Sequence, residues 1–174
     1  MTGEPRDDDA CLAFVQSELS PTVVRWALEG NGPAMDYLVA IARTVAIRYC
    51  RARIGRREGS FADADGLARQ ACLAAFASLW EVSDRETHFL AVVYRSALRA
   101  VGSWPHRDDP ATQVGRVAAL VAALPVRQRE TLVLRTVVGM STVQAAQALG
   151  WRTRAVRDVE REALTRLRSS LSSR

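Results

Sequence analysis

Arginines in the C-terminal third of the chain are the residues whose type and spacing point most clearly to chemistry. Within residues 152–171, four of them fall within about 60° of each other on a helical wheel. A guanidinium group binds phosphate or a guanine edge through two parallel hydrogen bonds, so such a helix is suited to nucleic acid. The alternative is a solvated side, in which the arginines pair along the helix with Asp158, Glu160 and Glu162. The four arginines are Arg154, Arg157, Arg161 and Arg168.

Side chains that perform bond chemistry are sparse. His88 and His106 are the two histidines, and the sequence has no HExxH or GxSxG motif and no glycine-rich phosphate loop. Cys11, Cys50 and Cys72 stand far apart without a CxxC pair, which argues against a zinc site and a disulfide framework. We therefore expect a cytoplasmic binding protein and not an enzyme, without metal or cofactor. No apolar run approaches the roughly 20 residues of a membrane span, so no membrane contact is expected.

The charge of the chain is divided unevenly along its length. Residues 1–110 contain 13 arginines and 15 acidic residues, a net charge of −2. Residues 111–174 contain 11 arginines and 4 acidic residues, a net charge of +7. This asymmetry predicts two modules with different partners, of which the C-terminal one binds nucleic acid.

The elements that must position the arginines follow a helix-turn-helix pattern. Gly139 ends one helix, Ser141 is suited to cap the next, and Gly150 supplies the tight turn before the arginine-bearing helix. In a helix-turn-helix, the second helix enters the major groove of DNA. The expected helices of this module cover residues 116–123, 127–138, 142–149 and 152–171.

The N-terminal half is also expected to be helical. A helix over residues 63–80 carries two apolar stripes, so it is either fully buried or shares one side with a partner. The segment SWPHRDDPAT, with two prolines and two adjacent aspartates, is typical of a linker. Further helices are expected from Ser20-Pro21 to Gly30, along the apolar stripe Leu38, Ile41, Val45, Tyr49 and Ala52 to Gly55, and over 88–104. The prediction is an all-α chain: a disordered acidic N-terminus at 1–20, a helical module at 21–102, a flexible linker at 103–115 and a helix-turn-helix module at 116–174.

The C-terminal sequence resembles a known family of transcription proteins. The string LPVRQRETLVLRTVVGMSTVQAAQALGWRTRAVRDVEREALTRLR, residues 124–168, is similar to region 4 of the extracytoplasmic-function (group four) sigma factors of bacterial RNA polymerase. More loosely, VAIRYCRARIG at 45–55 resembles a region 2 helix of actinobacterial members. The segments DADGLARQACLAAF at 63–76 and HFLAVVYRSALRAVGSW at 88–104 resemble the polymerase-binding helix and the helix that reads the minus-ten element. The chain is thereby identified as a member of this family.

The resemblance implies a sigma factor that binds core RNA polymerase and recognises promoter DNA to initiate transcription. The implied contacts with polymerase are to the clamp of its largest subunit and the flap of its second subunit. Because family members are commonly held by an anti-sigma factor, such a protein is a further expected partner. The alternative is a helix-turn-helix regulator that does not bind core polymerase.

The resemblance also assigns candidate site residues, although Phe89 and Tyr94 have the spacing of core residues as well. Candidates for the minus-thirty-five element are Arg152, Thr153, Arg154, Arg157 and Arg161. Candidates for the minus-ten element are His88, Phe89, Tyr94, Arg95, Arg99 and Trp104. Candidates for polymerase binding are Asp63, Asp65, Arg69, Gln70, Leu73 and Phe76.

Overall fold

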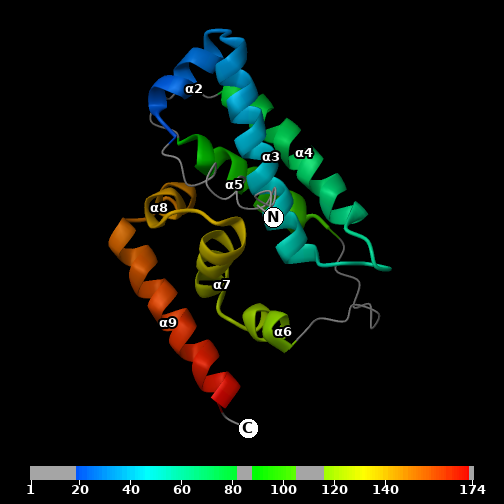
Figure 1. Cartoon of the computed structure of the whole chain (residues 1–174), viewed down its shortest axis with the longest axis vertical. Coiled ribbons are helices and arrows are strands. Elements are labelled where there is room, and N and C mark those ends of the chain that lie inside the picture. Colours follow the sequence, from blue (N-terminus) through cyan, green and yellow to red (C-terminus); the bar gives the residue numbers. More distant parts are fainter. Residues whose placement is uncertain (1–18, 82–87, 105–115, 173–174) are drawn as a thin grey trace, which may run out of the picture.

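The regular elements in the described part of the chain are helices. The computed structural model describes residues 19–81, 88–104 and 116–172, and its elements are drawn in Figure 1. In the N-terminal half these are α2 (Pro21–Leu28), α3 (Gly32–Ile54), α4 (Ala62–Glu81) and α5 (Phe89–Gly102). In the C-terminal half they are α6 (Arg116–Ala122), α7 (Val126–Leu132), the π-helical turn η1 (Val133–Val138), α8 (Thr142–Leu149) and α9 (Thr153–Ser172). The prediction of an all-α chain with a C-terminal helix-turn-helix is confirmed.

Local capping signals set the ends of the first helices. The Ser20 hydroxyl accepts a hydrogen bond from the Thr22 amide at 3.2 Å, and Pro21 follows at the first helical position. The Asn31 side chain accepts from the Ala34 amide at 2.9 Å and begins α3. Gly55 ends α3 with a φ of 74°, a backbone conformation that favours glycine. These ends agree with the expected breaks at Ser20-Pro21 and Gly55.

The N-terminal half is a bundle in which α3, α4 and α5 pack against each other. The predicted stripe of α3 supplies its core, with the exception of Ala52, which is exposed. Ala52 lies beside Arg51, which is exposed as well. The buried residues of the stripe are Leu38, Ile41, Val45 and Tyr49.

The helix predicted over residues 127–138 is interrupted by a change of helical type. It runs as an α-helix through α7 and then widens into the π-helical turn η1. The hydroxyls of Thr131 and Thr136 donate to the carbonyls of Arg127 and Leu132, at 2.8 and 2.6 Å. Threonine side chains that bond the carbonyl four residues earlier compete with the backbone ladder and bend helices. Gly139, with a φ of 85°, then ends the element as predicted.

The two halves pack directly on each other. Figure 1 shows α7, η1 and α8 below the N-terminal bundle, and α8 packs against α5 while η1 packs against α3. One hydrophobic cluster contains buried residues of α2–α5 together with Leu134, Val138 and Ala145 of the C-terminal half. A smaller cluster of Leu124, Leu132 and Ala163 lies between α6, α7 and α9.

Parts of the predicted domain division lie outside the described residues. These are residues 1–18 of the expected disordered N-terminus and residues 105–115 of the expected linker. The boundaries therefore stay predictions. Among the helices that the structure describes, none combines the length and apolar character needed to cross a bilayer.

Candidate nucleic-acid interface

The turn between α8 and α9 is built by local hydrogen bonds. The Ser141 hydroxyl accepts from the Gln144 amide at 3.1 Å, and the Gln144 side chain accepts from the Ser141 amide at 2.8 Å. This reciprocal capping box fixes the start of α8. Gly150 turns the chain with a φ of 68°, and the Trp151 amide donates to the Ala146 carbonyl at 2.9 Å. The result is a tight connection between α8 and α9.

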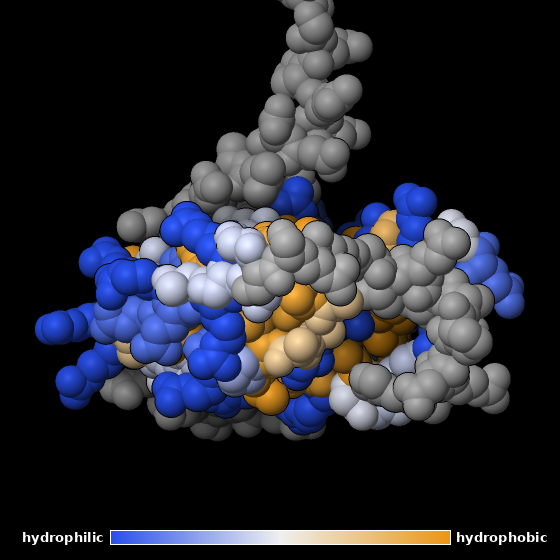
Figure 2. All heavy atoms as spheres, turned by 90° about the horizontal axis from the view of Figure 1, so that it is seen from below, coloured by the Kyte–Doolittle hydropathy of each residue, from blue (hydrophilic) through white to orange (hydrophobic). Residues whose placement is uncertain are grey.

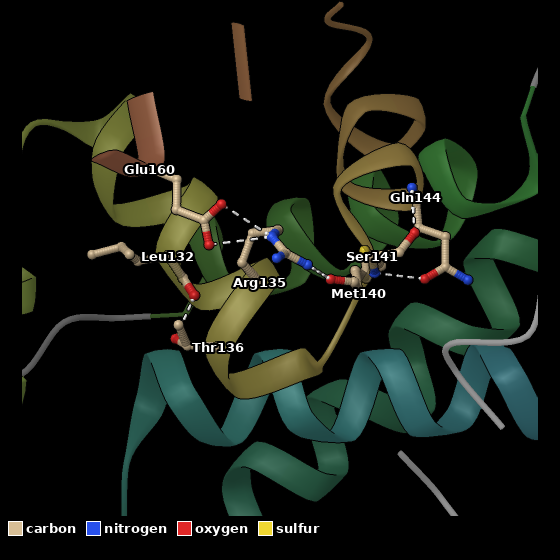
Figure 3. A network of polar contacts seen from close by, with 7 residues as sticks. All are labelled: Leu132, Arg135, Thr136, Met140, Ser141, Gln144 and Glu160. Carbon is tan, nitrogen blue, oxygen red and sulfur yellow. Dashed lines mark hydrogen bonds and ion pairs between the residues drawn. The ribbon is translucent and has the colours of Figure 1, made fainter. Parts of the chain in front are cut away.

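A polar network holds α9 against η1, the element that precedes α8 (Figure 3). The Arg135 Nε of η1 donates to both carboxylate oxygens of Glu160, each at 3.2 Å. The same guanidinium donates to the Met140 carbonyl in the loop before α8. Glu160 therefore pairs with an arginine outside α9. In the alternative given for the sequence, a solvated side of α9, Glu160 would have paired with arginines of the same helix. Arg135 connects η1, the loop and α9, and so fixes how α9 is presented.

The predicted minus-thirty-five residues lie at the exposed start and along the outer side of α9. Arg152, Arg154, Arg157 and Arg161 are exposed and Thr153 is half-buried, whereas Val156 and Ala163 on the opposite side are buried. Arg154 and Arg161 pair with Asp158 at 3.9 and 3.2 Å. These exposed ion pairs are weak. Within the described residues Arg157 has no ion-pair partner, so its guanidinium is available. In the view from below, hydrophilic side chains gather on the side where α9 begins (Figure 2).

The predicted minus-ten residues divide into two groups. His88, at the N-cap of α5, and Arg95 and Arg99 along α5 are exposed. Trp104 is half-buried, with the Arg57 guanidinium 5.9 Å from its ring centre.

Phe89 and Tyr94 form the second group and are buried. The Phe89 ring packs 6.0 Å from Phe76, and the Tyr94 ring meets Tyr49 edge-on at 5.5 Å. This placement favours the core alternative for both residues. A periodic apolar pattern could not separate them from stacking residues, because both uses need the same spacing.

The predicted polymerase-binding residues lie on α4, which is buried on one side only. Ala71, Ala75 and Leu79 face the bundle, so the first alternative, full burial, is wrong for this helix. The other apolar stripe leaves Leu73 74% and Trp80 58% exposed. Trp80 was not among the residues predicted to bind polymerase. It follows Leu73 by seven residues, or two helical turns, and this spacing indicates that both lie on the same side of the helix. Of the remaining assigned residues, Asp63, Arg69 and Gln70 are exposed, and Phe76 is half-buried.

Asp65 has a structural partner inside the chain. Arg51 Nε and Nη2 each donate to one of its carboxylate oxygens at 2.7 Å. The two hydrogen bonds form a bidentate ion pair between α3 and α4. The hydrogen bonds from Arg51 hold the pKa of the Asp65 carboxyl below its usual range. The Phe61 ring lies 4.9 Å from the guanidiniums of both Arg51 and Arg56. Asp65 therefore orders the start of α4.

The cysteines that the structure describes are free thiols. Cys50 is buried, and burial raises the pKa of its thiol to about 12. Cys72 is half-buried, and burial raises the pKa of its thiol as well. In the described parts of the chain, no group of three or more histidine, cysteine or acidic side chains could hold a metal ion.

Comparison with known proteins identifies the family. A family model described as "Sigma-70, region 4" matches residues 115–158, which include α8 and the start of α9. The chain is 34% identical to the ECF RNA polymerase sigma factor SigD of Mycobacterium tuberculosis, over 97% of this chain and 96% of that protein. The chain belongs to the ECF RNA polymerase sigma factors. The predicted family is thus confirmed, and similarity over 97% of the chain disfavours the alternative of a helix-turn-helix regulator that does not bind core polymerase.

Two further relatives support this assignment. The ECF RNA polymerase sigma factor ShbA of Streptomyces griseus is 32% identical, over 84% of this chain and 92% of that protein. The solved structure of CnrH in complex with the cytosolic domain of CnrY aligns with a TM-score of 0.66 and 27% identity. That alignment covers 88% of this chain and 97% of CnrH, so both helical halves have counterparts.

Proposed function

We propose that this sigma factor binds core RNA polymerase through α4 and reads a promoter through α5 and α9, without bond chemistry of its own. The observation that carries the proposal is the exposed arginine side of α9. The capping box at the start of α8 and the Arg135–Glu160 pair hold this helix in place. A recognition helix needs exposed guanidiniums on the side that meets DNA. Contacts on its opposite side must fix the orientation of the helix. Such a protein acts in the cytoplasm, where bacterial polymerase works.

The minus-thirty-five element is assigned to the first half of α9. Its N-terminal amides, at Thr153 and the residues after it, are suited to a phosphate oxygen. Arg154 and Arg157 lie within the first two turns, where a helix in the major groove reaches base edges. Arg161 lies one turn further and is suited to a backbone phosphate. Arginine can donate two hydrogen bonds to guanine, which supplies sequence preference.

The minus-ten element is assigned to the exposed side of α5. Arg95 and Arg99 are separated by one helical turn, so both guanidiniums can follow one phosphate backbone. His88 precedes the helix and Trp104 follows it. Opened bases need a stacking surface, and an indole ring can supply one.

The docking surface for polymerase is assigned to the exposed side of α4. Leu73 and Trp80 supply apolar area there, and Arg69 and Gln70 supply polar contacts. Large apolar side chains that stay exposed on a small protein mark a binding surface for another protein. CnrH binds the cytosolic domain of CnrY in its solved structure. That complex supports the expectation that an anti-sigma factor is a further partner of this chain.

The proposal is tested by reconstitution. The purified chain is mixed with bacterial core polymerase and separated by size, and the complex is then given promoter fragments of the source genome. We expect a one-to-one complex and transcripts that begin at discrete sites, whereas core polymerase alone gives none. A chain that binds promoter DNA but never associates with core polymerase would contradict the proposal.

A further inference from the structure

The acidic residues of α9 differ in what they contact. Glu160 accepts from Arg135 of η1 at 3.2 Å, as Figure 3 shows. Glu162 accepts from the side-chain amide of Gln128 on α7 at 3.5 Å. Both carboxylates therefore have a partner elsewhere in the helix-turn-helix module. The third acidic residue, Asp158, has its ion-pair partners on α9 itself within the part of the chain that the structure describes.

The Asp158 carboxylate lies on the exposed side of α9 between two guanidiniums. One of its oxygens lies 3.2 Å from Arg161 Nη1, and the other lies 3.9 Å from Arg154 Nε. The side chain of Asp158 is 45% exposed, so its oxygens have room for a further hydrogen bond. Residues four positions before and three positions after a given residue share its side of a helix. The carboxylate is therefore part of the arginine side that we assign to DNA.

Asp158 also lies close to the start of the recognition helix. Since α9 begins at Thr153, Asp158 is in its second turn, next to Arg157. The N-terminal residues of a recognition helix reach the base edges in the major groove. An aspartate at this position is therefore placed to meet a base, whereas Glu162 lies one turn further from the start of the helix.

A carboxylate in the major groove weakens binding to DNA in general. The phosphates of both strands repel it, and it can accept hydrogen bonds but donate none. This repulsion is offset only where a base presents a hydrogen-bond donor to the carboxylate. An acidic side chain on a recognition helix therefore discriminates between sequences more than it adds affinity.

The donors in the major groove determine which base a carboxylate prefers. Cytosine presents an amino group there, and adenine presents an amino group beside its N7 acceptor. Guanine and thymine present acceptor atoms, which repel a carboxylate. An aspartate is thus best matched to cytosine. The guanine paired with that cytosine presents O6 and N7, to which a neighbouring arginine can donate.

We propose that Asp158 is a specificity-determining residue, which accepts a hydrogen bond from a cytosine amino group in the minus-thirty-five element while Arg154 donates to the paired guanine. The proposal rests on the proposed function, because it takes α9 to lie in the major groove. Arg161 keeps its assignment to a backbone phosphate. Its positive charge then lies between that phosphate and the carboxylate and reduces their repulsion.

The test is a selection of promoter sequences by the polymerase complex. Core polymerase and the full chain are mixed with copies of one promoter in which the minus-thirty-five element is randomised, and the bound fragments are sequenced. With the unchanged chain, we expect cytosine to be enriched roughly tenfold over guanine and thymine at one position of the element. Circular dichroism verifies that each variant of the chain keeps its helix content.

Substitutions at Asp158 should change the base that is selected. Asp158→Asn should shift the preference at that position from cytosine to adenine, because a carboxamide both donates and accepts and so matches N6 and N7 of adenine. Asp158→Ala should abolish the preference there and tighten binding to unrelated DNA, because a repelled charge is removed. Arg154→Ala should weaken the preference at the same base pair. A residue that only stabilised α9 would change the affinity for all sequences alike.

The matched control is Glu162→Gln, which removes a negative charge from the same helix one turn later. It should leave the base preferred at each position as it is with the unchanged chain. A second control is Asp36→Asn, the same chemical change at an exposed aspartate of α3. It should alter neither affinity nor base preference.

Two results would overturn the role of Asp158 while the chain still directs core polymerase to discrete promoters. One is the same base preference at every position for Asp158→Asn and the unchanged chain. The other is a preference for a base other than cytosine, in the unchanged chain, at the position that Asp158→Asn alters. If neither the unchanged chain nor any variant selects a sequence together with core polymerase, the proposed function itself fails.

Discussion

Arg135 and Glu160 face each other across the helix-turn-helix, with the guanidinium Nε 3.2 Å from both carboxylate oxygens. The two residues are 25 positions apart, and their side chains are 25% and 19% exposed. A partly buried pair with two hydrogen bonds is stronger than a surface ion pair. The orientation of α9 therefore depends on Arg135, a residue that is not among the predicted DNA contacts.

Replacing Glu160 should loosen α9 and weaken promoter binding indirectly. We expect Glu160→Gln to lower the free energy of unfolding by about 1 to 2 kcal/mol, because the hydrogen bond from Arg135 loses its charged acceptor. The control is Asp158→Asn, which removes only exposed pairs and should cost less than about 0.5 kcal/mol. Urea denaturation of the full chain measures both variants. Equal costs would contradict a distinct role for the Arg135–Glu160 pair.

The helix-turn-helix could be predicted because its determinants are local. Ser141, Gly139 and Gly150 each signal a helix end within a few residues of sequence. The Arg135–Glu160 pair could not be predicted in the same way, because its residues are 25 positions apart and Arg135 lies in a π-helical turn. At that turn the Thr131 and Thr136 hydroxyls compete with the backbone hydrogen bonds of the helix. The spacing of apolar residues does not reveal this competition.

The contacts of Glu130 were equally hidden from the sequence. An acidic residue in a polar run such as VRQRET is expected at the surface, yet Glu130 is buried against Tyr49 and Tyr94. Those tyrosines carry the apolar spacing of core residues and give no local sign of a partner 81 or 36 positions away. Charge asymmetry predicted two modules of different character, but a contact between distant parts of the chain is a tertiary property.

The Arg51–Asp65 pair should give a small pH-dependent contribution to stability. Because the pKa of Asp65 is lowered on folding, this contribution is present above the unfolded value of about 4 and is lost as the pH falls through the folded value. The pair is partly exposed, so we expect a few tenths to about 1 kcal/mol between the unchanged chain and Asp65→Asn at pH 7. That difference should shrink below about pH 4. Asp63→Asn, an exposed neighbour, is the control, and a difference that does not change with pH would contradict the assignment.

Among the arginines of α9, we expect Arg157 to read a base. We expect Arg157→Ala to cost about 1 to 3 kcal/mol of promoter affinity and to relax sequence preference at one position of the minus-thirty-five element. Arg166→Ala, an exposed arginine in the second half of α9, should reduce affinity less and equally for all sequences. Binding of the polymerase complex to promoter variants distinguishes the two. An unchanged footprint and affinity for Arg157→Ala would mean that this side chain faces solvent in the complex.

Leu73 should be the most sensitive position of the polymerase-binding surface. Since its side chain is 74% exposed, Leu73→Asp places a charge where water already reaches and should leave the helix content unchanged. In a complex the same carboxylate would be buried without a partner, a cost of several kcal/mol that should reduce core binding more than tenfold. Val39→Asp, at an exposed valine of α3, is the matched control and should bind normally. Leu79→Asp, on the buried side of α4, should instead unfold the bundle. If Leu73→Asp keeps full affinity while the chain stays folded, another surface must contact polymerase.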